Sequence, residues 1–173
     1  MEKQEISDLL KAGKEELLTL LESISENNIN KIPFKDSWTA AELADHLVKS
    51  TSSFSKLLKN KVEDTPADFP DRVENIKDVM LDFDKKFQAP EFIIPKKNNC
   101  KKDKLLITLN SLFEDLINSV SSLDLSKTCT LFEMPGVGKV TRREAVWFVI
   151  YHTQRHNHQL KNIIKVLKER SDV

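Results

Sequence analysis

Three histidines in this sequence stand at positions that suit a metal-binding site. His46 lies in the segment WTAAELADHL, while His152 and His156 form an HxxxH pair in WFVIYHTQRHNHQL. Side chains four residues apart on a helix face the same way, so the pair can bind one ion, and a third histidine from another helix would complete a three-ligand site with open positions. A neutral imidazole is a costly core residue unless something binds it.

The helix starts place these histidines at a common level. Two T-x-x-E capping boxes, Thr39–Glu42 and Thr141–Glu144, mark where the histidine-bearing helices begin. Counted from these starts, His46 is seven residues in and the HxxxH pair is eleven and fifteen residues in, so a modest stagger of the helices brings all three together. Each histidine alone has a simpler interpretation, because single core histidines and chance HxxxH matches are common. The shared register of all three favours the metal.

Polar side chains share the faces that carry the histidines. Gln159 falls close to the His152 direction on its helix, and Ser50 and Ser53 follow His46 on its own face. Glu42 lies four residues before His46 and could reach the site, although its capping role already explains it. We therefore name Gln159, Ser50 and Glu42 as candidates for orienting the ligands or a bound water from behind.

Helix-breaking residues mark the boundaries of the helices that must hold these side chains. All six prolines lie outside four long segments with helical periodicity. We expect helices at about 3–28, 39–60, 100–122 and 142–170. The connection 61–98, with a short helix near 72–87, is too long for a tight turn and suits a crossover along the outside of a bundle. The prediction is an all-α fold, a four-helix bundle with a long crossover connection between the second and third helices.

Composition narrows the classes of function. At 173 residues the chain is expected to form one domain spanning 1–173. Lys+Arg and Asp+Glu are balanced at 27 each, so no net field attracts nucleic acid or an anionic membrane. The charged, helix-periodic N-terminus is neither a signal peptide nor a transit sequence, and no segment has the apolar length of a membrane span. We expect a cytoplasmic protein without nucleic-acid or membrane partners, whose two cysteines are free thiols.

Three segments together resemble the DinB-like (YfiT-like) family of metal-binding four-helix bundles, which is distinct from the DNA polymerase of the same name. That family shows a Trp-rich entry to the second helix ending in His, a Pro-x-x-Gly turn before the last helix, and a final HxxxH followed by Gln. The matching positions here are Trp38, Glu42 and His46; Pro135 and Gly138; and His152, His156 and Gln159. The resemblance is strong over the second and fourth helices and elsewhere rests on architecture.

The resemblance implies a divalent metal, commonly nickel or zinc, held by His46, His152 and His156 with other positions open. Family members are often transferases or isomerases that use a low-molecular-weight thiol, and others are described as hydrolases. Both chemistries suit three neutral ligands, because the ion keeps its full Lewis acidity and lowers the pKa of a bound water or thiol. The sequence shows no Ser-His-Asp or Cys-His pattern, so we do not expect a covalent nucleophile from the protein.

Three classes of function stay open from the sequence. The first is a metal-dependent enzyme acting on a small molecule, either a thiol S-transferase or a hydrolase. The second is a metal-binding bundle without turnover, acting as a sensor or storage module, and the third is a metal-free helical interaction module. Helix arithmetic suggests that substrate enters from the side of Trp38 and the 132–140 turn. The near-zero net charge offers little repulsion between copies, and family members often pair, so we expect a homodimer.

Overall fold

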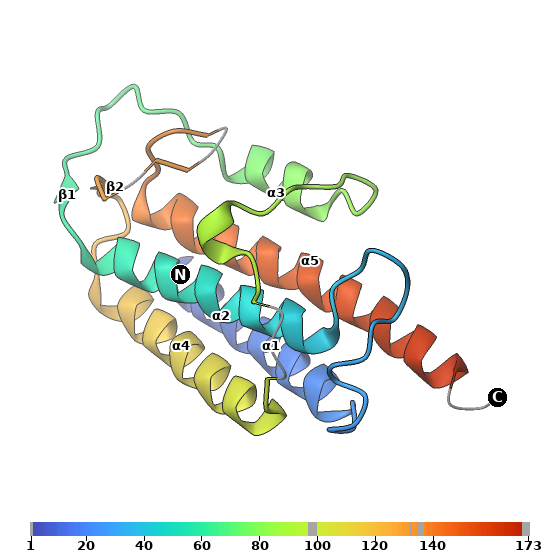
Figure 1. Cartoon of the computed structure of the whole chain (residues 1–173). Helices are drawn as coiled ribbons and strands as arrows, with labels where there is room; N and C mark the ends of the chain where they lie inside the picture. The colour runs from blue at the N-terminus through green and yellow to red at the C-terminus, as the bar shows by residue number, and fades with distance from the viewer. Residues whose placement is uncertain (1, 97–99, 132, 135–136, 171–173) are drawn as a thin grey trace.

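Four long helices form the body of the protein, as the sequence predicts (Figure 1). The computed structural model describes residues 2–96, 100–131, 133–134 and 137–170. The long helices are α1 (Glu2–Glu22), α2 (Ala40–Lys59), α4 (Lys102–Ser122) and α5 (Arg142–Glu169). Smaller elements are the helix α3 (Val73–Leu81), the 3-10 turn η1 (Glu91–Ile93) and the short strands β1 (Val62–Glu63) and β2 (Thr128–Cys129).

The first two long helices, α1 and α2, are consecutive in the chain but are not neighbours in the bundle. α1 packs against α4 and α5, and α2 packs against the same two helices, so α1 and α2 occupy opposite corners. α1 and α5 run in one direction and α2 and α4 in the other (Figure 1). Side-chain contacts agree, since Lys3 near the start of α1 reaches Ser121 near the end of α4, and Arg142 at the start of α5 donates to the Leu58 carbonyl near the end of α2.

Apolar stripes with helical spacing account for the core. Along α1 the side chains of Ile6, Leu10, Leu17 and Leu21 are fully buried or nearly so, and the same periodicity buries one face of each long helix. The predicted end of the first helix at 28 is wrong, because α1 stops at Glu22. The residues that follow are rich in Ser and Asn, which favour turns over helix, and Ser23 already bonds back to the Leu20 carbonyl.

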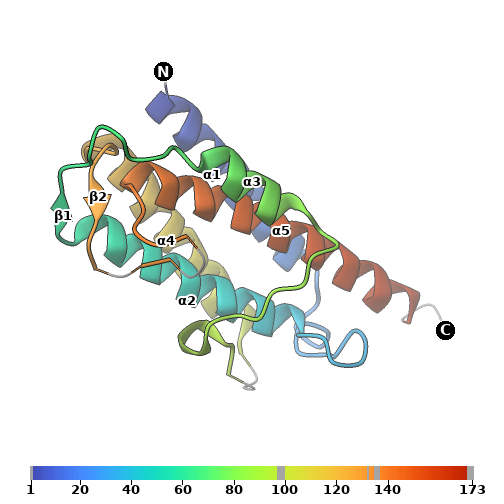
Figure 2. The ribbon, with the colours of Figure 1, turned by 90° about the horizontal axis from the view of Figure 1, so that it is seen from above.

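The connection between α2 and α4 is the predicted crossover. β1 pairs antiparallel with β2, α3 packs on α5, and η1 packs on α2. Figure 2 shows this segment running over α5 and then across α2 before it reaches α4; residues 97–99 lie outside the described part. The short helix expected near 72–87 is α3, which ends at Leu81. Within the described ranges, no helix has the length and apolar character to cross a bilayer.

Candidate metal centre

The ring nitrogens of three histidines converge between α2 and α5. The Nε2 atom of His152 lies 3.2 Å from Nε2 of His46 and 3.0 Å from Nε2 of His156. One ligand atom from each side chain lies within 4.8 Å of the others. His46 and His156 are buried, and His152 keeps part of its surface accessible. The structure thus brings together the three residues singled out by spacing.

Hydrogen bonds at the far side of two rings determine which nitrogen carries the proton. The Nδ1 atom of His46 lies 3.0 Å from the backbone carbonyl of Ile93, and Nδ1 of His156 lies 2.7 Å from Oε1 of Gln159. A carbonyl oxygen only accepts, so in both rings Nδ1–H is the donor and Nε2 of the neutral ring bears a lone pair. Two lone pairs therefore point into the space between the rings, as metal ligation requires.

Burial keeps these rings neutral. It lowers the pKa of His156 to about 3, with the neighbouring His46 adding to the effect. It lowers the pKa of His152 well below its ordinary value, and the other two histidines lower it further. The pKa of His46 is also lowered, chiefly by burial. A cluster that stays unprotonated at neutral pH can donate its lone pairs to a cation.

The spacing of the nitrogens fits a transition-metal ion. Two nitrogens bound at about 2.0–2.1 Å to one ion, with bond angles between about 90° and 110°, lie about 2.8–3.4 Å apart. The two measured Nε2–Nε2 distances, 3.2 Å and 3.0 Å, fall within this interval. Neutral imidazole suits zinc and nickel. The donor set, its spacing and its protonation state are all compatible with such an ion.

Aromatic rings line two of the histidines. The ring of Trp38 lies 5.0 Å from that of His46, and Phe148 stacks on His152 at 5.3 Å between centroids. Phe54 in turn stacks on Phe148 at 4.9 Å. Trp38 and Phe148 are half-buried, so apolar surface lies between the imidazoles and solvent and lowers the local dielectric.

The residues named as orienting candidates have different surroundings. Gln159 contacts the cluster directly, through the bond to His156. The carboxylate of Glu42 instead accepts from the Thr39 backbone N–H at 2.8 Å, completing the capping box of α2. Ser50 is buried on the His46 face, but no hydrogen bond joins Ser50 or Glu42 to the histidines in the described ranges. Gln159 thus occupies an orienting position, and the roles of the other two remain predictions.

The expected stagger of the two helices is not what aligns the histidines. α2 and α5 are antiparallel, so the end of α2 lies beside the start of α5, where Arg142 donates to the Leu58 carbonyl at 2.7 Å. His46 precedes Leu58 by about as many residues as the HxxxH pair follows Arg142. The rings reach one level because the histidines of both helices lie at similar distances from the end where Leu58 and Arg142 meet. Their distances from the two helix caps do not determine the alignment.

The expected entrance formed jointly by Trp38 and the 132–140 turn is therefore wrong. Trp38 precedes the start of α2 and contacts His46. The described part of the turn lies at the opposite end of α2, where Lys139 pairs with Glu63 just after that helix ends. Of the Pro-x-x-Gly motif, Pro135 lies outside the described residues, and Gly138 has a φ of 84°, a left-handed conformation that favours glycine.

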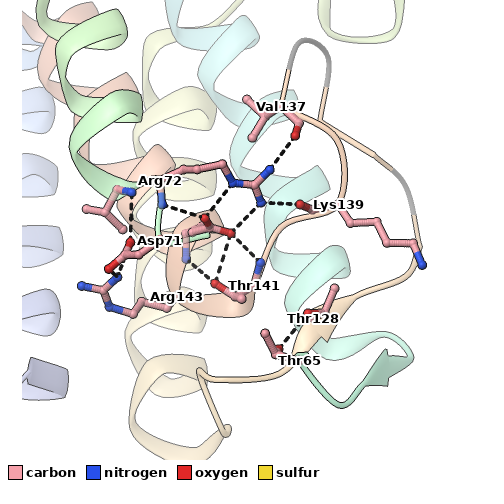
Figure 3. A network of polar contacts seen from close by, with 10 residues as sticks. Thr65, Asp71, Arg72, Thr128, Val137, Lys139, Thr141 and Arg143 are labelled. Carbon is pink, nitrogen blue, oxygen red and sulfur yellow. Dashed lines mark hydrogen bonds and ion pairs between the residues drawn. The ribbon is translucent and has the colours of Figure 1, made fainter. Parts of the chain in front are cut away.

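The start of α5 holds a polar network of a different kind, here called the Arg72–Glu144 network (Figure 3). The Glu144 carboxylate is nearly inaccessible at 2%, and it accepts from Nε and Nη2 of Arg72, each at 3.0 Å, and from the Thr141 backbone N–H at 2.9 Å. The same guanidinium donates to the carbonyls of Val137 and Lys139. This network ties the start of α3 and the 137–140 turn to the cap of α5.

Two groups near the cluster have no sequence signal of their own. The Ile93 carbonyl is a backbone atom, so any residue type would supply it. Arg155 is buried next to His156 and donates to the backbone carbonyls of Met80, in the last turn of α3, and Asp82, just after it. The sequence places Arg155 one residue before His156, but it does not show that residues 80–85, distant in sequence, fold against this side chain.

Comparison with known proteins agrees with this fold. A model of the DinB superfamily matches residues 9–160. YuaE of Bacillus subtilis (strain 168), an uncharacterized protein, is 27% identical over 143 residues, which cover 83% of this chain and 87% of YuaE. The solved structure of YfiT from Bacillus subtilis, described as a probable metal-dependent hydrolase with an unusual four-helix bundle topology, superposes with a TM-score of 0.61 at 16% identity, covering 94% of this chain and 86% of YfiT. The chain therefore belongs to the DinB superfamily.

Proposed function

We propose that this protein is a metal-dependent hydrolase of small molecules, with its divalent ion held by His46, His152 and His156. One observation carries the proposal: three Nε2 atoms converge at 3.0–3.2 Å about His152, and the two outer rings are held in the tautomer that directs a lone pair inward. The description of YfiT as a probable metal-dependent hydrolase supports the choice of reaction.

The protein's own residues would prepare the centre in two ways. The Ile93 carbonyl and Gln159 orient the rings, and Trp38 and Phe148 exclude water from two sides. A bound divalent ion would supply Lewis acidity, because three neutral ligands leave its charge intact to activate a water and polarise a substrate oxygen.

The carboxylates close to His46 in sequence are committed elsewhere. Glu42 completes the helix cap, and Asp45 pairs with Lys49 at 2.9 Å and accepts from the Lys96 backbone N–H. Neither is placed as a ready general base. We therefore expect activation of water to depend on the ion's charge more than on a carboxylate, so activity should follow metal occupancy closely.

The test is turnover by the metal-loaded protein. The purified chain, loaded with either Zn²⁺ or Ni²⁺, is assayed against a panel of small esters and amides, with the His152→Ala variant as control. Metal-dependent hydrolysis that is lost in the variant supports the proposal. A second arm adds a small thiol and an electrophile, and thiol transfer without hydrolysis would replace the proposed reaction by the transferase alternative. No turnover in either arm by a protein that retains its ion would indicate a binding module.

A further inference from the structure

We propose that Arg155 is a positioning residue of the metal centre, acting through residues 80–94, here called the strap. Arg155 holds the strap against α5 so that the Ile93 carbonyl reaches His46. The inference rests on the metal site proposed above, and it assigns a role to a residue that touches neither the ion nor a ligand ring in the proposed arrangement.

The surroundings of Arg155 are unusual for an arginine. The residue is only 6% exposed. Its guanidinium donates to three backbone carbonyls, at 3.0 Å to Met80, at 2.8 Å to Asp82, and to Lys85. The Phe87 ring lies 4.8 Å from the guanidinium carbon. A buried cation needs such compensation, and its partners here all belong to the first half of the strap.

The strap is attached to α5 at a second point and to α2 at its other end. Phe83 stacks on His158 of α5 with ring centroids 4.1 Å apart. On α2, the Ile93 carbonyl accepts from His46 at 3.0 Å and the Ile94 carbonyl accepts from Lys49 at 2.7 Å. The strap therefore bridges the two helices that carry the histidines.

This bridge gives Arg155 a route to the ligand geometry. The Ile93 carbonyl is the group that holds the proton of His46 on Nδ1, which leaves Nε2 free to bind an ion. A strap released from α5 would move this carbonyl, and His46 could then rotate or take the other tautomer. By thermodynamic linkage, an ion bound at the histidines must also favour the docked strap.

Arg142 offers a matched control. It is also a buried arginine of α5, 8% exposed, and it also donates to backbone carbonyls, those of Leu58 and Asp124. These carbonyls lie at the end of the bundle away from the strap. The variants Arg155→Met and Arg142→Met thus each remove one buried guanidinium from the same helix, and only the first releases the strap.

The experiment measures Zn²⁺ affinity and the tautomer of His46 in the full chain. We expect Arg155→Met to weaken Zn²⁺ binding about tenfold, the lower end of what loss of an orienting partner costs, and to reduce the Nδ1–H population of His46 in the zinc-free protein, as seen by 15N NMR. Arg142→Met should change neither. Equal affinities for wild type and Arg155→Met, or an equal loss in both variants, would overturn the positioning role while leaving the metal site standing.

A measurement on the wild type covers the case in which Arg155→Met does not fold. The backbone amides of Ile93 and Ile94 are hydrogen-bonded within the strap, and saturating Zn²⁺ should slow their hydrogen exchange severalfold. Zinc binding without slower exchange at these amides would refute the coupling. A wild type that binds no Zn²⁺ would refute the metal site itself, and the role of Arg155 with it.

Discussion

Two buried polar clusters on α5 differ in whether the protein itself supplies a hydrogen-bond partner for every polar atom. In the Arg72–Glu144 network every oxygen of the carboxylate faces a donor of the chain, at distances near 3 Å. In the histidine cluster, about two turns further along the helix, two Nε2 lone pairs face a third nitrogen. A network completed internally stabilises the fold. In the histidine cluster Nε2 of His152 carries one proton at most, so it cannot satisfy both lone pairs, and this favours a cation from outside.

The two capping boxes sharpen this contrast. Thr39–Glu42 and Thr141–Glu144 have the same pattern and the same reciprocal bonds. Of the two glutamates, only Glu144 also pairs with an arginine, Arg72. Glu144 lies at the start of α5, and through Arg72 it attaches the crossover segment to that helix. The same local motif thus serves one helix as a cap and the other as a cap with a tertiary anchor.

The largest effect on stability is expected at the satisfied cluster. Glu144→Ala should lower the free energy of unfolding by about 2–4 kcal/mol, because it leaves the Arg72 guanidinium without its carboxylate and removes a cap. Glu42→Ala, which removes a cap alone, should cost about 1 kcal/mol. Urea denaturation of the metal-free variants measures both. Equal costs for the two would show that the ion pair with Arg72 contributes little.

The unsatisfied cluster should behave in the opposite way. His152→Ala should abolish stoichiometric Zn²⁺ binding, and with it the stabilisation of about 2.7 kcal/mol that Zn²⁺ supplies at a hundredfold excess over its Kd. The metal-free variant should unfold within about 1 kcal/mol of the metal-free wild type. Thermal melts with and without Zn²⁺ provide the comparison, with His158→Ala as control. A variant that keeps its full complement of Zn²⁺ would remove His152 from the site.

Acid should weaken the metal-free fold through the histidines. Burial lowers the pKa of His156 to about 3 from an ordinary 6.5, so between these values the unfolded chain binds a proton that the folded chain does not. Stability is then unaffected above about pH 6.5 and falls with decreasing pH below it, by up to about 1.4 kcal/mol per pH unit for such a group. His156→Gln should show a shallower fall over pH 4–6.5. Identical slopes would mean that His156 titrates normally.

The smallest expected effect concerns the orientation of one ring. Gln159→Ala removes the acceptor of the His156 Nδ1–H and should weaken Zn²⁺ binding about tenfold, since orienting partners of metal ligands typically contribute this much or more. Gln154→Ala, at another half-buried position of α5, should leave the affinity unchanged. Isothermal titration calorimetry distinguishes the two. Unchanged Zn²⁺ affinity in Gln159→Ala would show that the bond between Gln159 and His156 does not orient the ring for metal binding.

Local patterns predicted the elements and the identity of the clustered residues. Apolar periodicity, proline positions and the two capping boxes placed the starts of α2 and α5 within a residue, because these signals act over one or two helical turns. The choice of His46, His152, His156 and Gln159 rested on the same short-range spacing and on the family resemblance.

Tertiary geometry lay beyond those patterns. The antiparallel order of α2 and α5 depends on the crossover. Counting from the caps therefore put Trp38 and the 132–140 turn at one entrance, whereas Trp38 and the described part of that turn lie at opposite ends of α2. The Ile93 carbonyl that orients His46 has no side-chain signature. Groups supplied by backbone, or by a segment far away in sequence, appear only once the chain is folded.

The tautomers of the histidines on addition of Zn²⁺ test the central claim most directly. In the metal-free protein, 15N NMR should show His46 and His156 with the proton on Nδ1, as their carbonyl partners require. One equivalent of Zn²⁺ should shift Nε2 of His46, His152 and His156 together and put the proton of His152 on Nδ1, while the nitrogens of His158 keep their protonation. Unchanged Nε2 signals in the three rings, or zinc-dependent shifts confined to His158, would contradict a metal centre between α2 and α5.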